Sequence, residues 1–332
     1  MRLIQFENRQ GQRQVGLIGE PRIEVLRGVR STRELALSAI AAKSSLADHV
    51  RTLQRETGPI YRDVLDAGLV LPPLDHDDPA HCLVSGTGLT HLGSAATRDK
   101  MHQQPAAQEE DTLTDSMQMF RWGMQGGRPG AGCVGAQPEW FYKGDGSIVV
   151  RPGADLPVPD FAEDFGEEPE LTGLYVIGDD RRPYRLGYAL GNEFSDHVLE
   201  RKNYLYLAHS KLRFCSFGPE LRVGQLPAHL AGISRIRRGG QVLWEKEFLS
   251  GEENMCHSLE NLEYHHFKYA QFLRPGDVHV HFFGTATLSF ADGVKAQPGD
   301  RFEVSLDAFG APLINGIRVH QAGIAPGEVS AL

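Results

Sequence analysis

Hydrophobic positions in the first 70 residues follow the short periods of a small, separate unit. The expected elements are strands at Met1–Phe6 and Gln14–Ile18 and helices at Ser31–Ala42 and Ser45–Gly58, each helix with a serine at its N-cap. The proline-rich stretch Leu71–Pro79 then breaks all periodicity and is expected to be a linker. The pattern therefore predicts a small N-terminal α/β domain, residues 1–75, and a larger domain, residues 80–332.

From His81 onward, short apolar stretches alternate with glycine and proline, which is typical of strands joined by tight turns. The expected strands are Cys82–Val84, Trp140–Tyr142, Ile148–Val150, Leu174–Ile177, Arg185–Leu190, Val278–Phe283, Thr287–Phe290 and Phe302–Leu306, and the best helices are Thr112–Met124 and Leu259–Leu273. Because no helix regularly separates consecutive strands, a doubly wound sheet is disfavoured. We predict an α+β, mainly β fold, a mixed and largely antiparallel roll or barrel-like sandwich.

Composition narrows the possible partners. Of the 332 residues, 41% are hydrophobic and 23% charged, so a sizeable core can form. The formal net charge is −9 and no basic run or basic–aromatic stripe is present, so a nucleic-acid partner is not expected. An anionic substrate would need a local cluster of cations or a bound metal to overcome this overall sign.

The four cysteines lie far apart without CxxC spacing, and we expect them to be small buried residues rather than metal ligands or disulfides. A reducing compartment fits this usage. The N-terminal residues lack the apolar core of a signal peptide, and no stretch approaches the length needed to cross a membrane. The expected location is therefore cytoplasmic, without a membrane partner.

Acidic side chains gather where the strand at residues 174–177 begins, in the run Glu167-Glu168-Pro169-Glu170. Residues two apart on a strand share a face, so Glu168 and Glu170 are expected to project together. The next predicted strand leads into Glu193, and pairing the two strands would add a third carboxylate. Carboxylates so close repel one another unless a cation or a proton lies between them.

Three hard oxygen ligands without cysteine or clustered histidine favour Mg²⁺ or Mn²⁺ over Zn²⁺, and Ca²⁺ is also compatible. The alternative is an acidic, solvated strand edge, which the pattern alone does not exclude. His279 and His281 also share a strand face, but no third ligand lies at zinc spacing, so buried, hydrogen-bonded histidines are expected there.

Several motifs in order resemble the fumarylacetoacetate-hydrolase superfamily across residues 80–320. They are Glu168-Pro169-Glu170-Leu171, Asn192-Glu193-Phe194-Ser195, Gly284-Thr285 and Pro298-Gly299-Asp300. Further stretches, Ser85–Ser94, Asn192–His197 and His209–Arg213, look like the 2-keto-3-deoxyarabonate dehydratase branch of that superfamily. Glu193 stands where the family usually has aspartate, which keeps the charge but moves the carboxylate outward by one methylene.

The resemblance implies roles for individual residues, a homodimer and a place in sugar-acid catabolism. It implies the metal ligands Glu168, Glu170 and Glu193, the substrate-binding residues Lys143, Ser195, His197, Gly284 and Thr285, and the catalytic residues Lys211 and His91. Thr285 corresponds to the threonine that holds the substrate carboxylate. Lys211 corresponds to the catalytic lysine before the Gly218-Pro219 turn.

Two departures from the family bear on the reaction. The hydrolases often carry an H-x-x-E dyad that activates water, but here His91 is followed by Leu92, Gly93 and Ser94. Glu109 or Glu110 in a long polar insertion is the candidate replacement for the missing glutamate. An arginine and a glutamine that grip substrate in the family are also lost, and His197 stands in the arginine's place.

The chemistry expected of such a site starts from a 2-keto acid that chelates the metal through its carboxylate and keto oxygens. The metal then acts as a Lewis acid and lowers the pKa of the C3 protons. We expect Mg²⁺-dependent dehydration of a 2-keto-3-deoxy sugar acid, most simply a pentonate that yields 2,5-dioxopentanoate. Lys211 is the candidate base, which requires a lowered pKa, and His91 or a Glu-bound water is the candidate acid.

Three alternatives stay open at the sequence level. A hydrolase would cleave a 2,4-diketo acid into pyruvate and a second carboxylic acid through an activated water. A decarboxylase acting on an oxaloacetate-type acid could use the same site. A noncatalytic sugar-acid-binding protein on the same scaffold would bind ligand without turnover.

Overall fold

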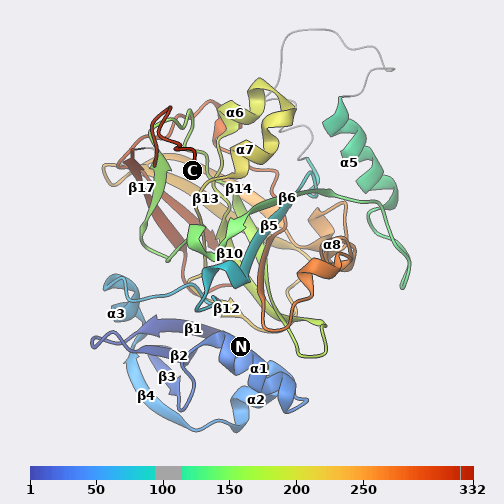
Figure 1. The fold of residues 1–332 in the computed structure, drawn as a ribbon. Helices are drawn as coiled ribbons and strands as arrows, with labels where there is room; N and C mark the ends of the chain where they lie inside the picture. The colour runs from blue at the N-terminus through green and yellow to red at the C-terminus, as the bar shows by residue number, and fades with distance from the viewer. Residues whose placement is uncertain (94–113, 322) are drawn as a thin grey trace.

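The computed structural model describes residues 1–93, 114–321 and 323–332, and its strands form a 12-stranded sheet and a five-stranded sheet (Figure 1). The larger sheet runs in the order β4 (Arg55–Ile60), β3 (Arg22–Leu26), β2 (Arg13–Ile18), β1 (Arg2–Glu7), β12 (Leu221–Arg222), β10 (Pro183–Asn192), β9 (Pro169–Ile177), β15 (Val278–Phe282), β5 (Cys82–Gly88) and β6 (Glu139–Asp145). Two short strands, β11 (Cys215–Phe217) and β7 (Val149–Val150), attach beside β10. The predicted α+β, mainly β fold is confirmed.

The smaller sheet runs in the order β14 (Gln241–Ser250), β13 (Leu230–Arg238), β16 (Arg301–Leu306), β17 (Leu313–His320) and β8 (Asp155–Pro159). Most pairs are antiparallel, but β15 pairs with β5, β17 with β8 and β11 with β7 in parallel. The sheets are therefore mixed and largely antiparallel, as the strand-rich pattern predicts.

Helices are short and cover the sheets from several sides (Figure 1). They are α1 (Thr32–Ala41), α2 (Leu46–Thr52), α3 (Tyr61–Asp66), α5 (Asp115–Gly126), α6 (His197–Lys202), α7 (Leu207–Lys211) and α8 (Leu259–Phe267). The predicted serine caps are confirmed, because Ser31 and Ser45 accept hydrogen bonds from the backbone N–H groups of Glu34 and Asp48. No helix in the described ranges is long and apolar enough to cross a membrane.

Strands β9 and β10 lie at the centre of the molecule because both of their faces are covered. Leu174 and Val176 of β9 belong to a core shared with α1 and α2. Leu171 and Leu190 belong to a second core shared with the smaller sheet. A strand buried on both faces holds its register firmly, so its end is a rigid place for a site.

Some predicted elements are wrong in extent or type. The predicted helix Ser45–Gly58 is only α2, because Thr57 and its neighbours pair with β3 as strand β4. Thr287–Phe290 is not a strand but part of a loop that ends in a 3₁₀ turn at Phe290–Asp292. The predicted helix Leu259–Leu273 ends at Phe267 and is followed by a separate 3₁₀ turn.

The N-terminal strands continue the larger sheet, since Arg2 and Leu3 of β1 pair with Arg222 and Leu221 of β12. A buried carboxylate strengthens this junction: Glu220 accepts hydrogen bonds from the Tyr61 hydroxyl and from Arg2. The predicted boundary near residue 75 stays a prediction, but residues on its two sides share one sheet.

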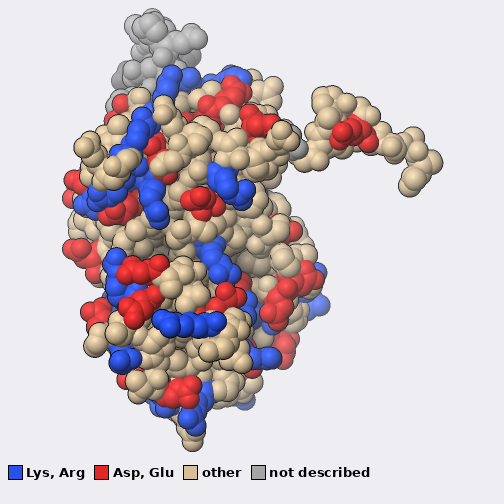
Figure 2. Space-filling view, turned by 90° about the vertical axis from the view of Figure 1, so that its left-hand side faces the viewer, with Lys and Arg blue, Asp and Glu red and all other residues tan. Residues whose placement is uncertain are grey.

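Charges of both signs are interspersed over the face of the molecule seen in Figure 2. Acidic and basic side chains are neighbours on this face. Local clusters, rather than the overall sign, decide what an anionic ligand meets.

Candidate metal centre and active site

Three glutamates converge where β9 and β10 meet. Glu170 pairs with Gly191 across the two strands, and just beyond the ladder Glu193 donates its backbone N–H to the carbonyl of Glu168 at 3.1 Å. One carboxylate oxygen from each of the three glutamates lies within 4.8 Å of the others. All three side chains are buried. The predicted convergence is therefore present in the structure, and the trio does not form a solvated strand edge.

The three carboxylates of this acidic triad, Glu168, Glu170 and Glu193, differ in their electrostatics. Burial alone would raise the pKa of Glu168, but contacts with Lys211 and His197 outweigh burial and hold this pKa well below its ordinary value. Burial, together with the charges of Glu168 and Glu193, holds the pKa of Glu170 well above its ordinary value. Burial and the charge of Glu168 likewise raise the pKa of Glu193. Three hard carboxylate donors in a buried cluster match the ligands that Mg²⁺, Mn²⁺ and Ca²⁺ take. The donor set therefore fits the divalent ion expected from the sequence.

Lys211 is a cation that contacts two of the three triad glutamates. Its ammonium donates to carboxylate oxygens of Glu168 and Glu193 and, at 3.0 Å, to the hydroxyl of Ser195. The ring of Phe141 lies 4.9 Å from the same nitrogen. Burial alone would lower the pKa of Lys211, but the charges of Glu168 and Glu193 outweigh burial and raise it. A base needs the opposite shift, so the structure departs here from the pKa expected of Lys211.

Lys143 lies behind the triad. It is fully buried and donates to Glu193, to the carbonyl of Phe194 at 2.8 Å and to the carbonyl of Lys211 at 2.9 Å. An ammonium has three N–H donors, and these three acceptors use all of them. The Lys143 side chain therefore supports Glu193 and has no donor left for a ligand, which argues against the predicted direct contact with substrate.

Ser195 and His197 also surround the ligand oxygens. The Ser195 hydroxyl donates to Glu193 at 3.1 Å, and the Nε2 atom of His197 lies 3.2 Å from Glu168 Oε1. The Nδ1 atom of His197 lies 3.2 Å from a carboxylate oxygen of Asp164. Burial would lower the pKa of His197, but hydrogen bonds to Asp164 and Glu168 raise it to about 10. These two carboxylates favour the protonated imidazole, and its predicted contact with substrate stays a prediction.

The loop after β15 contacts the triad through its backbone. Gly284 donates its N–H to Glu170 Oε2 at 2.7 Å and has a φ of +91°, in the left-handed region that favours glycine. A β-carbon at this position would lie 2.6 Å from Thr90 Oγ1 and 2.7 Å from the carbonyl oxygen of Thr87. Thr285 follows directly and is partly exposed. Gly284 therefore contacts the triad directly, and the substrate-binding roles of Gly284 and Thr285 stay predictions.

His91 is buried in a hydroxyl-rich setting. Its Nδ1 atom lies 3.0 Å from Thr90 Oγ1, and its Nε2 atom lies 3.1 Å from Ser250 Oγ. Burial lowers the pKa of His91 to about 4. The imidazole is therefore neutral near pH 7, and its catalytic role stays a prediction. Glu109, the other acid–base candidate, lies outside the described residues.

Two acids next to the triad were not assigned a role from the sequence. Glu167 is fully buried, and burial raises its pKa to about 7 although Ser289 donates two hydrogen bonds to it. Asp164 partners His197. Side chains alternate between the two faces of a strand, so the sequence already indicated that Glu167 points away from Glu168 and Glu170. No local pattern identifies its partner, because Ser289 lies 122 residues away.

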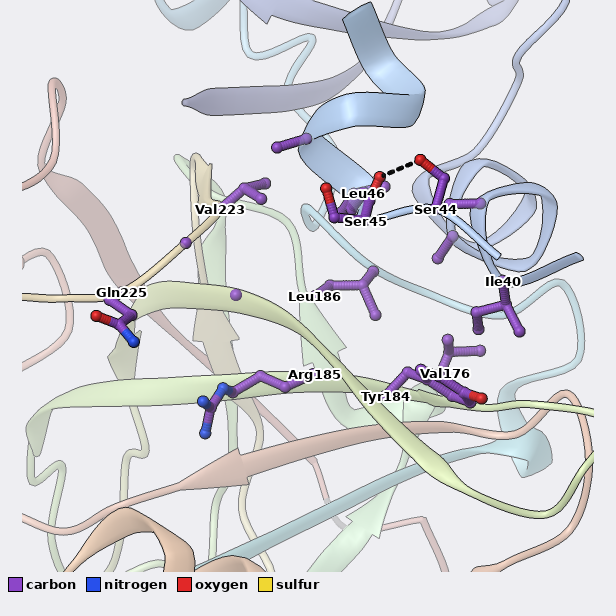
Figure 3. Close-up of a pocket in the computed structure, with 15 residues that line it drawn as sticks. Ile40, Ser44, Ser45, Leu46, Val176, Tyr184, Arg185, Leu186, Val223 and Gln225 are labelled. Carbon is purple, nitrogen blue, oxygen red and sulfur yellow. Dashed lines mark hydrogen bonds between the residues drawn. The ribbon is translucent and has the colours of Figure 1, made fainter. Parts of the chain in front are cut away.

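A separate cavity of about 460 Å³ lies between the N-terminal helices and strands β9 and β10. Figure 3 shows the apolar side chains Ile40 and Leu46 facing Val176, Leu186 and Val223. None of the three triad glutamates lines this cavity. The acidic cluster thus remains the better candidate for chemistry.

Comparisons with known proteins show which fold this site belongs to. No protein-family model matches the chain. The structure is similar over its length to that of a 2-keto-3-deoxy-D-arabinonate dehydratase complexed with magnesium and 2,5-dioxopentanoate, with a TM-score of 0.71, 21% identity, and coverage of 97% of this chain and 100% of the other. A 5-carboxymethyl-2-hydroxymuconate delta-isomerase from Mycobacterium smegmatis is similar with a TM-score of 0.57 and 17% identity, covering 96% of this chain and all of that one.

One curated relative is also similar in sequence. It is described as a "Probable 2-keto-3-deoxyxylonate dehydratase" of Haloferax volcanii and is 34% identical over 114 residues. The matching segment covers 33% of this chain and 38% of the relative. At these levels of identity and coverage, the solved structures establish the fold, and the activity of this chain has to be argued from its own site.

Proposed function

We propose that this protein is a Mg²⁺-dependent dehydratase of a 2-keto-3-deoxy sugar acid in sugar-acid catabolism, acting on a 2-keto-3-deoxypentonate to give 2,5-dioxopentanoate. The observation that carries the proposal is the buried triad of Glu168, Glu170 and Glu193 with Lys211 in contact. It lies in the fold of a dehydratase whose structure contains magnesium and 2,5-dioxopentanoate. The partial sequence match to a second dehydratase supports the same reaction class.

Glu168, Glu170 and Glu193 would hold the divalent ion, with Mg²⁺ as first choice and Mn²⁺ or Ca²⁺ as alternatives. When bound, the ion supplies Lewis-acid polarisation of the keto and carboxylate oxygens of a 2-keto acid. Lys143, Lys211 and His197 add positive charge around the triad, so a loaded site can accept an anionic substrate despite the net charge of −9.

Among the described residues, Lys211 is our candidate for the group that moves a proton. In the structure the carboxylates of Glu168 and Glu193 hold it as an ammonium. A divalent cation on these carboxylates would compete for their charge and weaken their hold on the ammonium, which favours the neutral amine that can accept a proton from C3. Burial of Lys211 among protein groups also keeps bulk water from the base.

The remaining roles, which are binding the substrate carboxylate, orienting the base and protonating the leaving hydroxyl, are assigned to neighbouring residues. Thr285, which is partly exposed and follows Gly284, would bind the carboxylate of the keto acid. Ser195 holds both Glu193 and Lys211, so it orients the base relative to the ligands. The hydroxyl that leaves C4 needs an acid, for which His91 stays a candidate.

We also propose a homodimer located in the cytoplasm. Leu205 and Tyr206, on the turn between α6 and α7, are 83% and 45% exposed, and exposed apolar side chains of this kind mark association surfaces. Light scattering coupled to size-exclusion chromatography tests the dimer. Elution as a monomer at micromolar concentration contradicts it.

The test of the reaction is direct. Purified protein with Mg²⁺ and each stereoisomer of 2-keto-3-deoxypentonate should form 2,5-dioxopentanoate, and EDTA should abolish product formation. Absence of product with all stereoisomers contradicts the proposed dehydration. Release of pyruvate from a 2,4-diketo acid would instead identify a hydrolase, and binding of the sugar acid without turnover would identify a noncatalytic protein.

A further inference from the structure

The loop that carries Thr285 is tied to one segment of chain at both of its ends. At the first end, Gly284 donates its N–H to Glu170 Oε2 at 2.7 Å. At the other end, Ser289 donates its backbone N–H to Glu167 Oε1 at 2.8 Å and its hydroxyl to Glu167 Oε2 at 2.6 Å. Glu167 and Glu170 are only three residues apart, so one short segment binds both ends of the loop.

We propose that Glu167 is a positioning residue of the active site, which clamps Ser289 and thereby fixes the loop that presents Thr285 to the substrate carboxylate. This inference rests on the proposed function and extends it. It assigns a task to a buried acid that belongs neither to the acidic triad nor to the groups that move protons.

Burial along the loop shows what the clamp presents. Gly284 at one end and Thr287, Leu288 and Ser289 at the other are buried, whereas Thr285 and Ala286 between them are partly exposed. The accessible part of the loop is therefore its middle, held from both sides.

No strand ladder supports this loop, because it leaves the sheet after β15. Within it, Thr287 donates its N–H to Thr285 Oγ1 at 3.2 Å and its hydroxyl to the carbonyl of Glu247 at 3.2 Å. A loop without ladder bonds depends on side-chain anchors for its conformation. The Glu167 clamp contributes the two shorter of these anchoring bonds at this end of the loop.

The clamp requires a carboxylate. Its two oxygens accept the two donors of Ser289 separately, and glutamine offers only one acceptor oxygen. Glu167 is fully buried, so water does not replace a lost bond at low cost. The same end of the loop also lies near the metal site. The ring centroid of Phe290 lies 5.3 Å from that of His197, and His197 pairs with the proposed metal ligand Glu168.

The experiment compares wild type with Glu167→Gln and Ser289→Ala, using Mg²⁺ and 2-keto-3-deoxypentonate. Glu220→Gln is the matched control, since Glu220 is an equally buried glutamate that also accepts a backbone N–H, from Gly310, but lies at the junction with the N-terminal strands. We expect KM to rise about tenfold or more in both clamp variants, with kcat changed by less than about threefold. Hydrogen exchange of the peptide spanning residues 284–292 should accelerate in the same variants and not in the control.

A KM that shifts no more than in Glu220→Gln, or loop exchange equal to wild type, overturns the clamp. If the clamp were only structural, Glu167→Gln would lower the melting temperature and leave KM unchanged, which also overturns the proposal. If wild type forms no 2,5-dioxopentanoate, the proposed function fails, and the exchange rates alone then decide: faster exchange supports the clamp and unchanged exchange overturns it.

Discussion

At the scale of single residues, the clearest consequence concerns the buried pair of Lys143 and Glu193, both fully inaccessible to solvent. Lys143→Met keeps most of the side chain's length but removes the ammonium, and with it one donor to Glu193 and one to each of the carbonyls of Phe194 and Lys211. Breaking a buried ion pair from one side typically costs about 3–5 kcal/mol. We expect the free energy of unfolding, measured by urea denaturation in EDTA, to fall by about that amount.

The control for this change is Lys246→Met. Lys246 pairs with Asp292 at 2.8 Å, but its side chain is 45% exposed. Exposed pairs contribute about 0–1 kcal/mol, so the control should be nearly as stable as wild type. Equal losses in the two variants would show that the contact between Lys143 and Glu193 does not stabilise the fold as its burial indicates.

Lys211 carries the second residue-level prediction. Lys211→Arg keeps the positive charge beside Glu168 and Glu193, but guanidinium does not deprotonate in proteins. We expect kcat for dehydration to fall by about 10²–10⁴-fold while Mg²⁺ still binds, because general-base catalysis contributes a factor of that order. Steady-state kinetics and calorimetric Mg²⁺ titration check the two parts separately. An active variant would exclude Lys211 as the base.

The sequence could predict which residues lie at the site better than what each one does there. Glu168 and Glu170 follow from the alternation of strand side chains, and Glu193 from pairing of two neighbouring strands. The task of Lys143 could not be predicted, because it depends on three acceptors 50 to 68 residues away. The pKa of Lys211 depends on the same long-range packing.

At the scale of elements, strand β15 and helix α8 enclose a cluster of neutral histidines. His266 Nε2 lies 2.9 Å from His279 Nδ1, and His281 Nδ1 lies 2.8 Å from Ser85 Oγ. Burial lowers the pKa of His279 to about 4 and of His281 to about 3, and it holds that of His266 well below its ordinary value. The prediction of buried, hydrogen-bonded histidines on this strand is confirmed, because His279 and His281 are buried and each has one hydrogen-bonded ring nitrogen.

These shifts predict a loss of stability in weak acid. The unfolded chain takes up protons on these histidines as pH falls through about 6.5, whereas the folded protein does not until pH reaches about 4 or below. The contribution of these histidines to stability is therefore fully present above about pH 6.5 and falls below it, by up to about 1.4 kcal/mol per pH unit for each histidine. Urea denaturation between pH 7.5 and 5 measures this slope.

Replacing one member of the cluster isolates its share. His281→Gln removes one titrating group. The dependence of the free energy of unfolding on pH below 6.5 should therefore decrease by up to about 1.4 kcal/mol per pH unit, which corresponds to one proton. His229→Gln, at an exposed position, is the control and should leave the slope as in wild type. An unchanged slope in the first variant would mean that His281 is protonated equally in folded and unfolded chains.

Elements were predictable where local pattern decides them. The predicted strands around residues 82, 175, 187 and 280 are confirmed because each contains a short apolar stretch, and both serine-capped helix starts are confirmed. The end of α2 was not predictable, because pairing of β4 with β3 overrides a helical pattern. The loop at Thr287–Phe290 has strand-like composition, but side-chain anchors hold it outside any ladder.

At the scale of the whole molecule, the mainly β architecture was predictable because the motifs that carry the resemblance are spread over residues 80–320. The attachment of the N-terminal strands was not, since β1 pairs with β12 across more than 200 residues and no local signal marks such a contact. The junction is more than a linker. It places α1 and α2 against the core behind β9, the strand that carries Glu170.

The stability of the whole protein should respond to the ion that the triad is built to hold. A ligand that binds only the folded state adds about 2.7 kcal/mol when its concentration is 100 times its dissociation constant. We expect the melting temperature to rise by several degrees when EDTA is replaced by saturating Mg²⁺, at matched ionic strength. Scanning fluorimetry measures the shift without any assumption about substrate.

The variant Glu170→Gln should change the melting temperature in opposite directions in EDTA and in Mg²⁺. In EDTA the variant removes the charge that burial and the neighbouring Glu168 and Glu193 oppose most strongly, so it should melt higher than wild type. In Mg²⁺ it lacks one of the three ligands, so most of the ion's stabilisation should disappear and the order of the two proteins should reverse or nearly close. A variant that melts lower than wild type in EDTA, or gains as much from Mg²⁺, would show that the three carboxylates do not share one cation. If the melting temperatures reverse as expected, the repulsion within the triad is a cost that the fold bears for binding the ion, and the charge that destabilises the empty protein also selects a divalent cation.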